Sequence, residues 1–352
     1  MPVSAVLQTS FLGDMVLTTP LLERLAGEGL VHVVATPANA AVLANHPAVA
    51  SVIVFDKRGA DRGWRGLRRV AERLRSVGAQ RAYLAQGSNR TAALAWLARI
   101  PERIGFETSG GKLFTTRRVP YNRTQHHAAR LWQLANPLGH DGTLPEPLRP
   151  SLYPGASDTA AVEALLRAYQ VAPGTSLLAL APGSVWATKR WPSFAALATA
   201  LVQRIDGASH GTAERVVVLG AAGDAPLAAE IARAVYEVGG PPVIDATGKL
   251  SLLGSAALLS RCRVLITNDS APLHLASAMN TPTVALFGPT VPGMGFGPLA
   301  EQQVVLGRKE LSCRPCHAHG PQQCPLGHWK CMRDLAPQDV AHAVLELAHS
   351  GG

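Results

Sequence analysis

Short apolar runs alternate with amphipathic stretches along the whole chain, and this alternation limits the fold more than any other feature. The apolar runs have the length of strands, and turns rich in Gly, Pro and Asp separate the segments. This order is typical of a parallel, doubly wound sheet. Because it occurs twice, we expect an α/β protein with two such domains facing each other. Strands are predicted at residues 3–8, 31–35, 52–55, 82–85, 176–181, 215–219, 243–245, 264–267 and 283–287.

The domain boundary is predicted at a cluster of four prolines. A chain of 352 residues has the length of roughly two domains, and the prolines mark the best linker between them. We expect a first domain over residues 1–155, a second over 156–335 and a final helical segment over 336–352. The linker prolines are Pro145, Pro147, Pro150 and Pro154. Helices are predicted at residues 17–26, 63–77, 126–136, 159–169, 194–205, 225–238, 252–260, 272–279 and about 337–348.

Composition and the first residues favour a cytoplasmic protein. Apolar residues make up 47% of the chain, which is enough for sizeable cores. No window holds about 18 unbroken apolar residues, the length that a membrane-spanning helix needs. The N-terminus has neither a basic region nor a signal-type cleavage site.

The positive charge of the chain is concentrated in its first half. The formal net charge is +9, and residues 1–150 carry all of this excess. Such a half could bind nucleic acid, an anionic membrane surface or a phosphorylated substrate. The lack of a nucleic-acid-binding motif and an aromatic content of 5% argue against nucleic acid. The arginines of the predicted helix at 63–77 form either an anion-seeking amphipathic surface or an ordinary solvated face.

The first candidate for chemistry is the loop that follows the first predicted strand. In open parallel sheets, ligands bind beyond the carboxyl ends of the strands. Here Gly13 lets the backbone approach a ligand closely, and Asp14 is presented at a helix start. Asp14 is a candidate general base if its carboxylate faces a cleft. The alternative is that Asp14 serves only as a helix N-cap.

Two loops of the second half favour a phosphate-bearing ligand. Gly183 and Ser184 follow a strand, and Lys189 lies near the next helix start, which suits a diphosphate. The helix predicted at 272–279 would bind phosphate oxygens through its free N–H groups and the Ser270 hydroxyl. Asp269 would accept hydrogen bonds from sugar hydroxyls. The alternatives are an ordinary strand–loop–helix turn at the first loop and a simple helix cap at the second.

Four of the five cysteines lie close together near the C-terminus. Their spacing is C-x2-C-x7-C-x6-C, with three histidines interspersed. One interpretation is a structural tetrahedral zinc site. The others are reduced thiols or a disulfide, and a cytoplasmic location disfavours the disulfide. The four residues are Cys313, Cys316, Cys324 and Cys331.

Several segments, in this order, resemble the ADP-heptose:lipopolysaccharide heptosyltransferases, glycosyltransferase family 9. The resemblance extends over about residues 3–345, and the Cys-rich tail is similar to that of heptosyltransferase II members. The matching segments are residues 10–20 (SFLGDMVLTTP), 181–184 (APGS), 189–192 (KRWP), 267–276 (TNDSAPLHLA) and 283–290 (TVALFGPT).

The resemblance implies a fold and a reaction type. The fold is GT-B, in which two Rossmann-like domains enclose a deep cleft. The N-terminal domain takes the acceptor, the C-terminal domain takes the nucleotide-sugar, and the final helix packs back toward the first domain. Transfer is inverting and needs no metal or other cofactor for chemistry.

The resemblance also implies roles for individual residues. Asp14 matches the general base that deprotonates the acceptor hydroxyl, and Asp269 matches a position near the donor sugar. The leaving ADP is stabilised where Lys189 lies. The remaining donor-side candidates are Ser184, Ser270 and His274, and the candidates for close backbone approach are Gly13 and Gly183. Arg90 either contacts acceptor anions or is structural.

The function expected from this resemblance is transfer of heptose from ADP-L-glycero-D-manno-heptose to the inner core of lipopolysaccharide, with release of ADP. The acceptor is then an anionic Kdo- or heptose-bearing lipid A precursor, and the enzyme would contact the inner membrane peripherally. Three alternatives remain: a family 9 transferase with another nucleotide-sugar or acceptor, a GT-B-like nucleotide-sugar 2-epimerase, and an inactive binding protein. The Gly13–Asp14 opening argues against the epimerase, and the presence of both Asp14 and Lys189 argues against the inactive protein.

Overall fold

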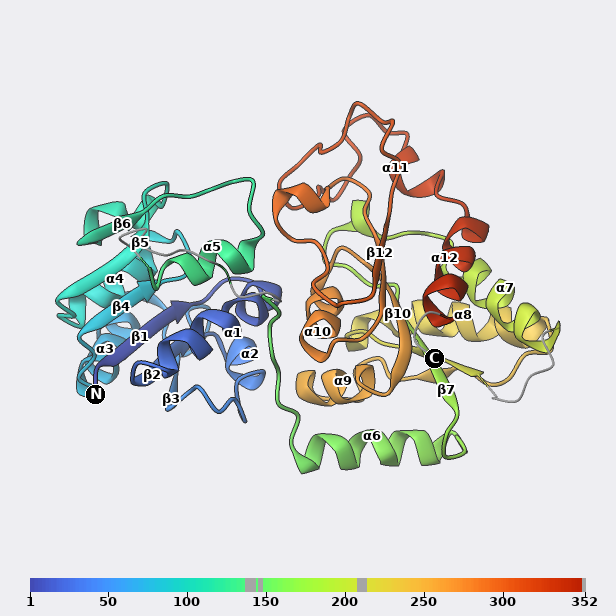
Figure 1. Ribbon diagram of the computed structural model, residues 1–352, viewed down its shortest axis with the longest axis horizontal. Coiled ribbons are helices and arrows are strands. Elements are labelled where there is room, and N and C mark those ends of the chain that lie inside the picture. The colour runs from blue at the N-terminus through green and yellow to red at the C-terminus, as the bar shows by residue number, and fades with distance from the viewer. Residues whose placement is uncertain (137–143, 145–147, 208–213, 350–352) are drawn as a thin grey trace. The chain divides into compact units, whose positions relative to one another are not determined.

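The computed structural model describes residues 1–136, 144, 148–207 and 214–349. The chain divides into two compact units, Met1–Tyr153 and Pro154–Gly352, which Figure 1 shows in blue to green and in green to red. Of the predicted linker prolines, Pro145 and Pro147 lie outside the described residues, whereas Pro154 begins the second unit. Among the helices of the described residues, none combines the length and the apolar character needed to cross a membrane.

The first unit is built on a six-stranded parallel sheet (Figure 1). The strand order is β3-β2-β1-β4-β5-β6, the order of dinucleotide-binding folds. The central strand β1 is buried from Ser4 to Gln8, as expected for a parallel strand covered on both faces. The strands are β1 (Val3–Gln8), β2 (Leu30–Ala35), β3 (Ser51–Val54), β4 (Arg81–Leu84), β5 (Glu102–Phe106) and β6 (Arg117–Val119).

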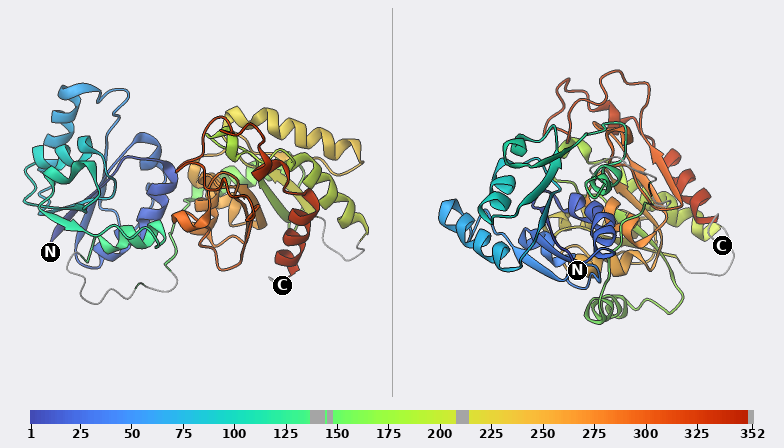
Figure 2. Two further views of the ribbon diagram at one scale, coloured as in Figure 1. Left: turned by 90° about the horizontal axis from the view of Figure 1, so that it is seen from above. Right: turned by 60° about the vertical axis from the view of Figure 1, so that its left-hand side comes forward.

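Helices cover both faces of this sheet (Figures 1 and 2). On one face, Leu67, Val70 and Leu74 of α3 pack against strand residues such as Leu7 and Leu84. Their spacing is that of a single apolar helix stripe. Helix α1 packs against α5 and β1. The helical segments are α1 (Leu12–Ala26), α2 (Pro37–Ala41), α3 (Gly63–Ser76), α4 (Asn89–Leu97), the 3-10 turn η1 (Gly110–Phe114) and α5 (His127–Gln133).

The second unit repeats the topology of the first. Its sheet order is β12-β11-β10-β7-β8-β9. Read from β9 and numbered within the unit, this is again 3-2-1-4-5-6, and every neighbouring pair is parallel. The strands are β7 (Ser176–Ala181), β8 (Glu214–Val218), β9 (Ile244–Asp245), β10 (Cys262–Asn268), β11 (Thr283–Leu286) and β12 (Gln303–Leu306).

The last helix, α12, belongs to the core of the second unit. Val340, Ala341 and Val344 are buried there among residues of β7, β8, β10 and β11, and α12 contacts α7. The buried face of α12 is therefore occupied by its own unit. The helical segments are α6 (Ala156–Ala168), η2 (Ala187–Lys189), α7 (Phe194–Gly207), η3 (Ala222–Asp224), α8 (Ala225–Glu237), α9 (Leu252–Leu259), α10 (Ala271–Met279), η4 (Pro292–Met294), α11 (Lys330–Arg333) and α12 (Pro337–His349).

The two parallel sheets with flanking helices confirm the predicted α/β class and its repetition. The sequence pattern did not predict β5, β6 and β12, nor the helices α2, α4 and α11. Strand β6 has only three residues, of which two are arginines, so it lacks an apolar run long enough to recognise. Helix α1 begins at Leu12, five residues before its predicted start at Leu17, because the early Gly13 weakens the helical pattern without preventing the helix.

Candidate active site

Asp14 lies just beyond the C-terminal end of β1, in the first turn of α1. The N-cap of this helix is Phe11, whose side chain makes no cap hydrogen bond, so the interpretation of Asp14 as the N-cap is wrong. Gly13 is the second helical residue. A carboxylate in the first turn is favoured by the partial positive charge of the helix N-terminus. The side chain of Asp14 keeps 19% of its surface exposed, so the helix presents it without burying it.

A short hydrogen-bonded chain orients Asp14. Ser10 Oγ donates to Asp14 Oδ2 at 2.5 Å and also lies 2.7 Å from Gln8 Oε1. Gln8 is fully buried in β1, and its Nε2 donates to the carbonyl of Ala85 and to Thr18 Oγ1. A serine hydroxyl carries one proton, so Ser10 donates to Asp14 or to Gln8, but not to both at once. Gln8 of β1 thereby helps to position Ser10, whose hydroxyl can donate either to the Asp14 carboxylate or to Gln8.

His127, the first residue of α5, approaches the same carboxylate from another segment of the first unit. Its Nε2 lies 3.9 Å from Asp14 Oδ1. Burial, with smaller contributions from Arg130 and His126, lowers the pKa of His127 to about 3. The imidazole is therefore neutral near pH 7 and leaves the negative charge of Asp14 uncompensated by this neighbour. No sequence pattern pointed to His127 as a site residue, because it lies more than a hundred residues from Asp14.

The guanidinium of Arg90 binds backbone carbonyls of the first unit. Its guanidinium donates to the carbonyls of Lys57 and Asp61 and lies over the ring of Phe55, 5.0 Å from the centroid. Lys57 in turn donates from Nζ to the carbonyl of Thr9 at 2.6 Å. Burial, together with the nearby Arg58 and Arg90, lowers the pKa of Lys57. Of the two interpretations of Arg90, these contacts favour the structural one.

In the second unit, the predicted site residues Lys189 and Asp269 form one buried cluster with Thr290. Lys189 Nζ donates to Asp269 Oδ2 at 2.6 Å, and Thr290 Oγ1 donates to the same oxygen at 2.6 Å. All three residues are less than a tenth exposed. Lys189 and Asp269 thus form a buried ion pair. An ammonium group has three N–H donors, so the contact with Asp269 uses one of them.

The N-terminus of α10 lies beside this cluster. Ser270 is its N-cap residue but makes no side-chain cap hydrogen bond, and Ser270 Oγ donates only weakly, at 3.4 Å, to the carbonyl of Asn268. His274, one turn into the helix, is buried and packs edge-on against Phe296. The positive end of α10 suits an anion. Because the Ser270 side chain makes no cap hydrogen bond, it does not act as a simple helix cap.

The loop after β7 is held by close packing. A Cβ atom on Gly183 would lie 2.5 Å from the Asp224 carboxylate, so a larger residue would have to displace that side chain. Asp224 accepts from the backbone N–H of Ala221, and Ser184 Oγ accepts from the N–H of Trp186 at 3.3 Å. The close approach at Gly183 is thus to a neighbouring loop of the same unit.

Two residues that the sequence pattern did not single out hold these loops together. Asn268 is fully buried, accepts from the N–H of Trp191 at 3.1 Å and donates to the carbonyl of Pro182 at 2.8 Å. Arg314, from the Cys-rich tail, donates to the carbonyls of Gly288, Phe287 and Thr290. Asn268 lies next to Asp269 in one of the motif segments, so the sequence could have pointed to it. No motif pointed to Arg314, because its role depends on where the tail folds.

The tail also packs over the lysine of the cluster. A Cβ atom on Gly320 would lie 3.1–3.2 Å from side-chain carbons of Lys189, and Thr188 donates to the carbonyl of Pro321. Trp186 stacks on His319, with ring centroids 6.3 Å apart. The segment around Gly320 therefore fixes the loop that carries Lys189.

The four tail cysteines lie in one segment of the second unit. Within the described ranges, no group of three or more His, Cys, Asp or Glu side chains is arranged to hold a metal ion. Cys331 is buried beside the core, where burial raises the pKa of its thiol to about 11. Cys313 Sγ lies 4.0 Å from His328 Nε2. All four are free cysteines, and the structural zinc stays a prediction.

Comparison with known proteins assigns the family. The family model described as glycosyltransferase family 9 (heptosyltransferase) matches residues 67–330. Lipopolysaccharide heptosyltransferase 1 of Pseudomonas aeruginosa is 31% identical over 88% of this chain and 84% of its own. Lipooligosaccharide heptosyltransferase 2 of Campylobacter jejuni is 32% identical, over only 50% of this chain and 52% of its own length.

The fold agrees with that assignment. The structure of Escherichia coli ADP-heptose LPS heptosyltransferase II superposes with a TM-score of 0.78 at 23% identity, covering 100% of this chain and 99% of the other. This likeness confirms the GT-B fold that the sequence motifs implied. With the family model covering most of both units, the chain belongs to glycosyltransferase family 9, the heptosyltransferase family, and is a glycosyltransferase.

Proposed function

We propose that this enzyme transfers heptose from ADP-L-glycero-D-manno-heptose to the inner core of a lipopolysaccharide precursor and releases ADP. The names of the similar proteins from Pseudomonas aeruginosa and Escherichia coli support this substrate class. The observation that carries the proposal is the carboxylate of Asp14, held by Ser10 at the C-terminal end of β1. A carboxylate oriented there is equipped to take a proton from a sugar hydroxyl.

The proposed step inverts the configuration at the anomeric carbon. The acceptor O–H bond breaks and its proton passes to Asp14, while the oxygen forms a bond to C1 of the heptose. The bond between C1 and the β-phosphate oxygen breaks, and its electron pair leaves with ADP. As Asp14 gains the proton it no longer needs the donor from Ser10. The Ser10 hydroxyl can then turn to Gln8 Oε1, 2.7 Å away, so the site stays hydrogen-bonded in both protonation states.

The second unit is proposed to hold the diphosphate of the donor. The N–H groups at the start of α10 and the Ser270 hydroxyl supply donors that stabilise the charge developing on ADP. Lys189 adds the two ammonium N–H groups that its contact with Asp269 does not use. Asp269 and Thr290 fix the position of this ammonium before the ligand arrives, which lowers the entropic cost of binding.

We propose further that no metal or cofactor takes part in the chemistry, since a base, helix N–H groups and a lysine supply each charge the step needs. Transfer in excess chelator should equal transfer without it. Elemental analysis of protein purified without chelator tests the separate prediction of a structural zinc on the tail. About one zinc per chain would support that prediction, and four free thiols without zinc would reject it.

Substitution Asp14→Asn tests the role of the base. It keeps the shape of the side chain but removes the acceptor of the proton, so the rate of transfer should fall roughly 10²–10⁴-fold. The affinity for ADP, measured by calorimetry, should stay unchanged, because the proposed donor site lies in the other unit. Glu107→Gln, an exposed carboxylate of the same unit, is the matched control and should transfer normally. Normal turnover by the Asp14 variant would refute the assignment.

The substrate assignment is tested with purified protein, a panel of nucleotide-sugars and truncated lipopolysaccharide acceptors. A product heavier than the acceptor by one heptose residue, formed only from the ADP-heptose, would support the proposal. Transfer of another sugar, or to another acceptor, would assign a different family 9 reaction. Conversion of a nucleotide-sugar without an acceptor would point to an epimerase.

A further inference from the structure

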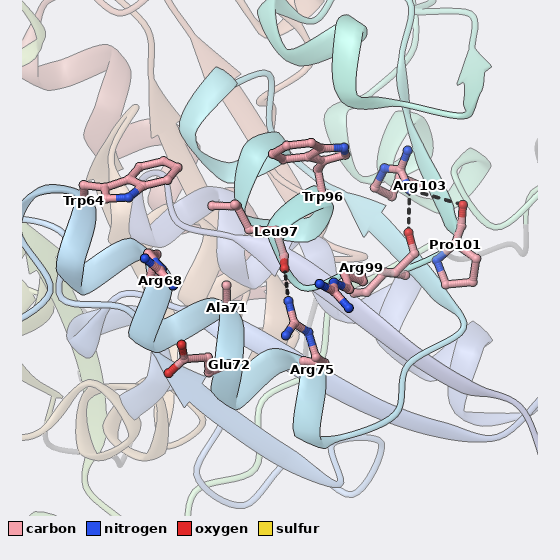
Figure 3. A pocket seen from close by; sticks show the side chains of 11 residues that line it. Trp64, Arg68, Ala71, Glu72, Arg75, Trp96, Leu97, Arg99, Pro101 and Arg103 are labelled. Carbon is pink, nitrogen blue, oxygen red and sulfur yellow. Dashed lines mark hydrogen bonds between the residues drawn. The ribbon is translucent and has the colours of Figure 1, made fainter.

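A groove of about 630 Å³ opens on the surface of the first unit and is lined by α3, α4 and the segment that leads into β5 (Figure 3). Its rim carries two large aromatic side chains, Trp64 and Trp96, which are 59% and 52% exposed. In Figure 3 both rings lie along the same edge of the groove. Neither the transfer step nor the carboxylate site uses any of these residues.

The groove is strongly cationic. Four arginines line it, against the single acidic side chain of Glu72. Two of the arginines are structural: Arg75 donates to the carbonyl of Leu97 at 2.6 Å, and Arg103 donates to the carbonyl of Phe114 at 2.6 Å. The other two are Arg68 and Arg99, which are exposed.

Arg68 and Arg99 have their guanidinium groups available for a ligand. Within the part of the chain that the structure describes, neither makes a side-chain hydrogen bond or an ion pair. By contrast, Arg69 and Arg73 of the same helix are both paired with Asp61. Part of the charge of helix α3 therefore faces solvent, whereas the charge of Arg69 and Arg73 is paired within the unit.

The apolar surface continues beyond the groove. Trp96 is in ring contact with Phe114 of η1, with centroids 5.9 Å apart. The neighbouring Leu113 is 85% exposed. Indole rings favour the headgroup level of a bilayer, where one end is apolar and the other is wet. An exposed leucine offers no flat face on which a nucleobase could stack, but it partitions readily into acyl chains.

We propose that this surface, made of Trp64, Trp96, Leu113, Arg68 and Arg99, docks the enzyme on an anionic lipid bilayer. A headgroup phosphate enters the groove and is bound by Arg68 and Arg99. Trp64, Trp96 and Leu113 insert at the boundary between headgroups and acyl chains. The inference rests on the proposed function in one respect, since an enzyme that modifies a lipid-linked acceptor gains from being held at a membrane.

Flotation of the full-length protein with vesicles tests the docking surface. The protein should bind vesicles of phosphatidylglycerol mixed with phosphatidylcholine and should not bind vesicles of phosphatidylcholine alone. The double variant Arg68→Gln/Arg99→Gln should bind about thirtyfold more weakly, from roughly 1 kcal/mol for each cation near an anionic surface. The control Arg58→Gln/Arg123→Gln removes the same charge at exposed positions outside the groove and should retain most of the affinity.

The aromatic residues give an independent readout. On binding, tryptophan fluorescence should shift to the blue and be quenched by brominated lipids, and both effects should be clearly smaller in Trp64→Ala, which leaves Trp96 as the other inserting indole. This single variant leaves the contact between Trp96 and Phe114 intact, so a folding defect is not expected there, and an unchanged melting temperature checks this.

Three results would overturn the proposal: equal loss of binding in the two arginine pairs, unchanged quenching in Trp64→Ala, or tighter binding of a single-stranded oligonucleotide through the same residues. Transfer to a delipidated, water-soluble acceptor separates this proposal from the proposed function. The groove variants should turn over that acceptor like the wild-type protein. A wild-type protein that binds vesicles through the groove but transfers no heptose would contradict the proposed function alone.

Discussion

The two units share one strand order but carry opposite charges at the equivalent loop. After β1, the first strand of unit one, the chain presents the carboxylate of Asp14. After β7, the first strand of unit two, it presents the ammonium of Lys189. The shared topology determines where a ligand can bind, at the carboxyl ends of the parallel strands. The side chains in the loops determine the chemistry, and we propose a base in the first unit and an anion site in the second.

The units also differ in how each charge is held. Asp14 keeps a fifth of its side chain exposed and contacts neutral groups, Ser10 and His127. Lys189 is buried and paired with the opposite charge of Asp269. The Asp14 carboxylate is thus partly accessible to solvent, whereas Lys189 is part of the packing. Substitutions at the two sites should therefore separate activity from stability.

The largest effect on stability is expected from Lys189→Met in the second unit. Methionine keeps most of the apolar stem but leaves the buried Asp269 without its cation, which should cost about 3 kcal/mol of unfolding free energy. Denaturant unfolding measures this loss. Lys189→Met/Asp269→Asn removes both charges and should recover much of it. If the single variant were as stable as the wild type, the ion pair would not be a structural element and the contrast between the units would fail.

A smaller effect is expected from Ser10→Ala in the first unit. The hydrogen bond from Ser10 favours the ionised form of Asp14, so without it the carboxylate is easier to protonate. The acidic limb of the kcat/KM profile should move up by about one to two pH units, since a hydrogen bond to a charged group is worth about 1.5–3 kcal/mol. Ser10→Thr keeps a hydroxyl and should restore the profile. A lower rate with an unmoved profile would make Ser10 merely structural.

Mild acid should weaken the first unit selectively. Burial lowers the pKa of His46 to about 4 and that of His127 to about 3, from 6.5 in the unfolded chain. The unfolded state therefore binds protons first, and the stabilisation, complete above pH 6.5, is lost as the pH falls toward these values. Between pH 7 and pH 6 the loss should be less than about 1.4 kcal/mol for each histidine.

Hydrogen exchange resolved by peptide measures the acid effect unit by unit. Exchange should accelerate first in peptides of α5, and the variant His46→Gln/His127→Gln should flatten the dependence on pH. Equal acceleration in both units would show that the two histidines do not account for the acid sensitivity.

Alkali should lower the stability of the second unit by no more than acid lowers that of the first unit. Burial raises the pKa of Cys262 to about 12 and that of Cys331 to about 11, from 9.0 in the unfolded chain. The unfolded thiols lose their protons first, so the stabilisation is complete below pH 9 and is lost as the pH rises above it. Peptides of β10 and α11 should exchange faster at pH 10. Cys262→Ala/Cys331→Ala should lower this pH dependence, and an unchanged dependence would contradict the assignment.

The sequence by itself determined the α/β class, the repeated parallel sheet and the loops that carry Asp14, Lys189 and Ser270. It could do so because a parallel strand buried on both faces must be apolar over its whole length, and because ligand loops follow such strands. Strands β5 and β6 escaped prediction because arginine and glutamate interrupt their short apolar patterns.

Only the tertiary structure decided which side chains meet. It brought His127 to Asp14, paired Lys189 with Asp269, and gave Arg90 to the carbonyls of Lys57 and Asp61. These residues are far apart in the sequence, and their hydrogen-bonding capacity can be satisfied by many partners. The periodicity of a segment records which face is buried, but not which distant segment buries it, and the same limit hid the groove that Trp64 and Trp96 share.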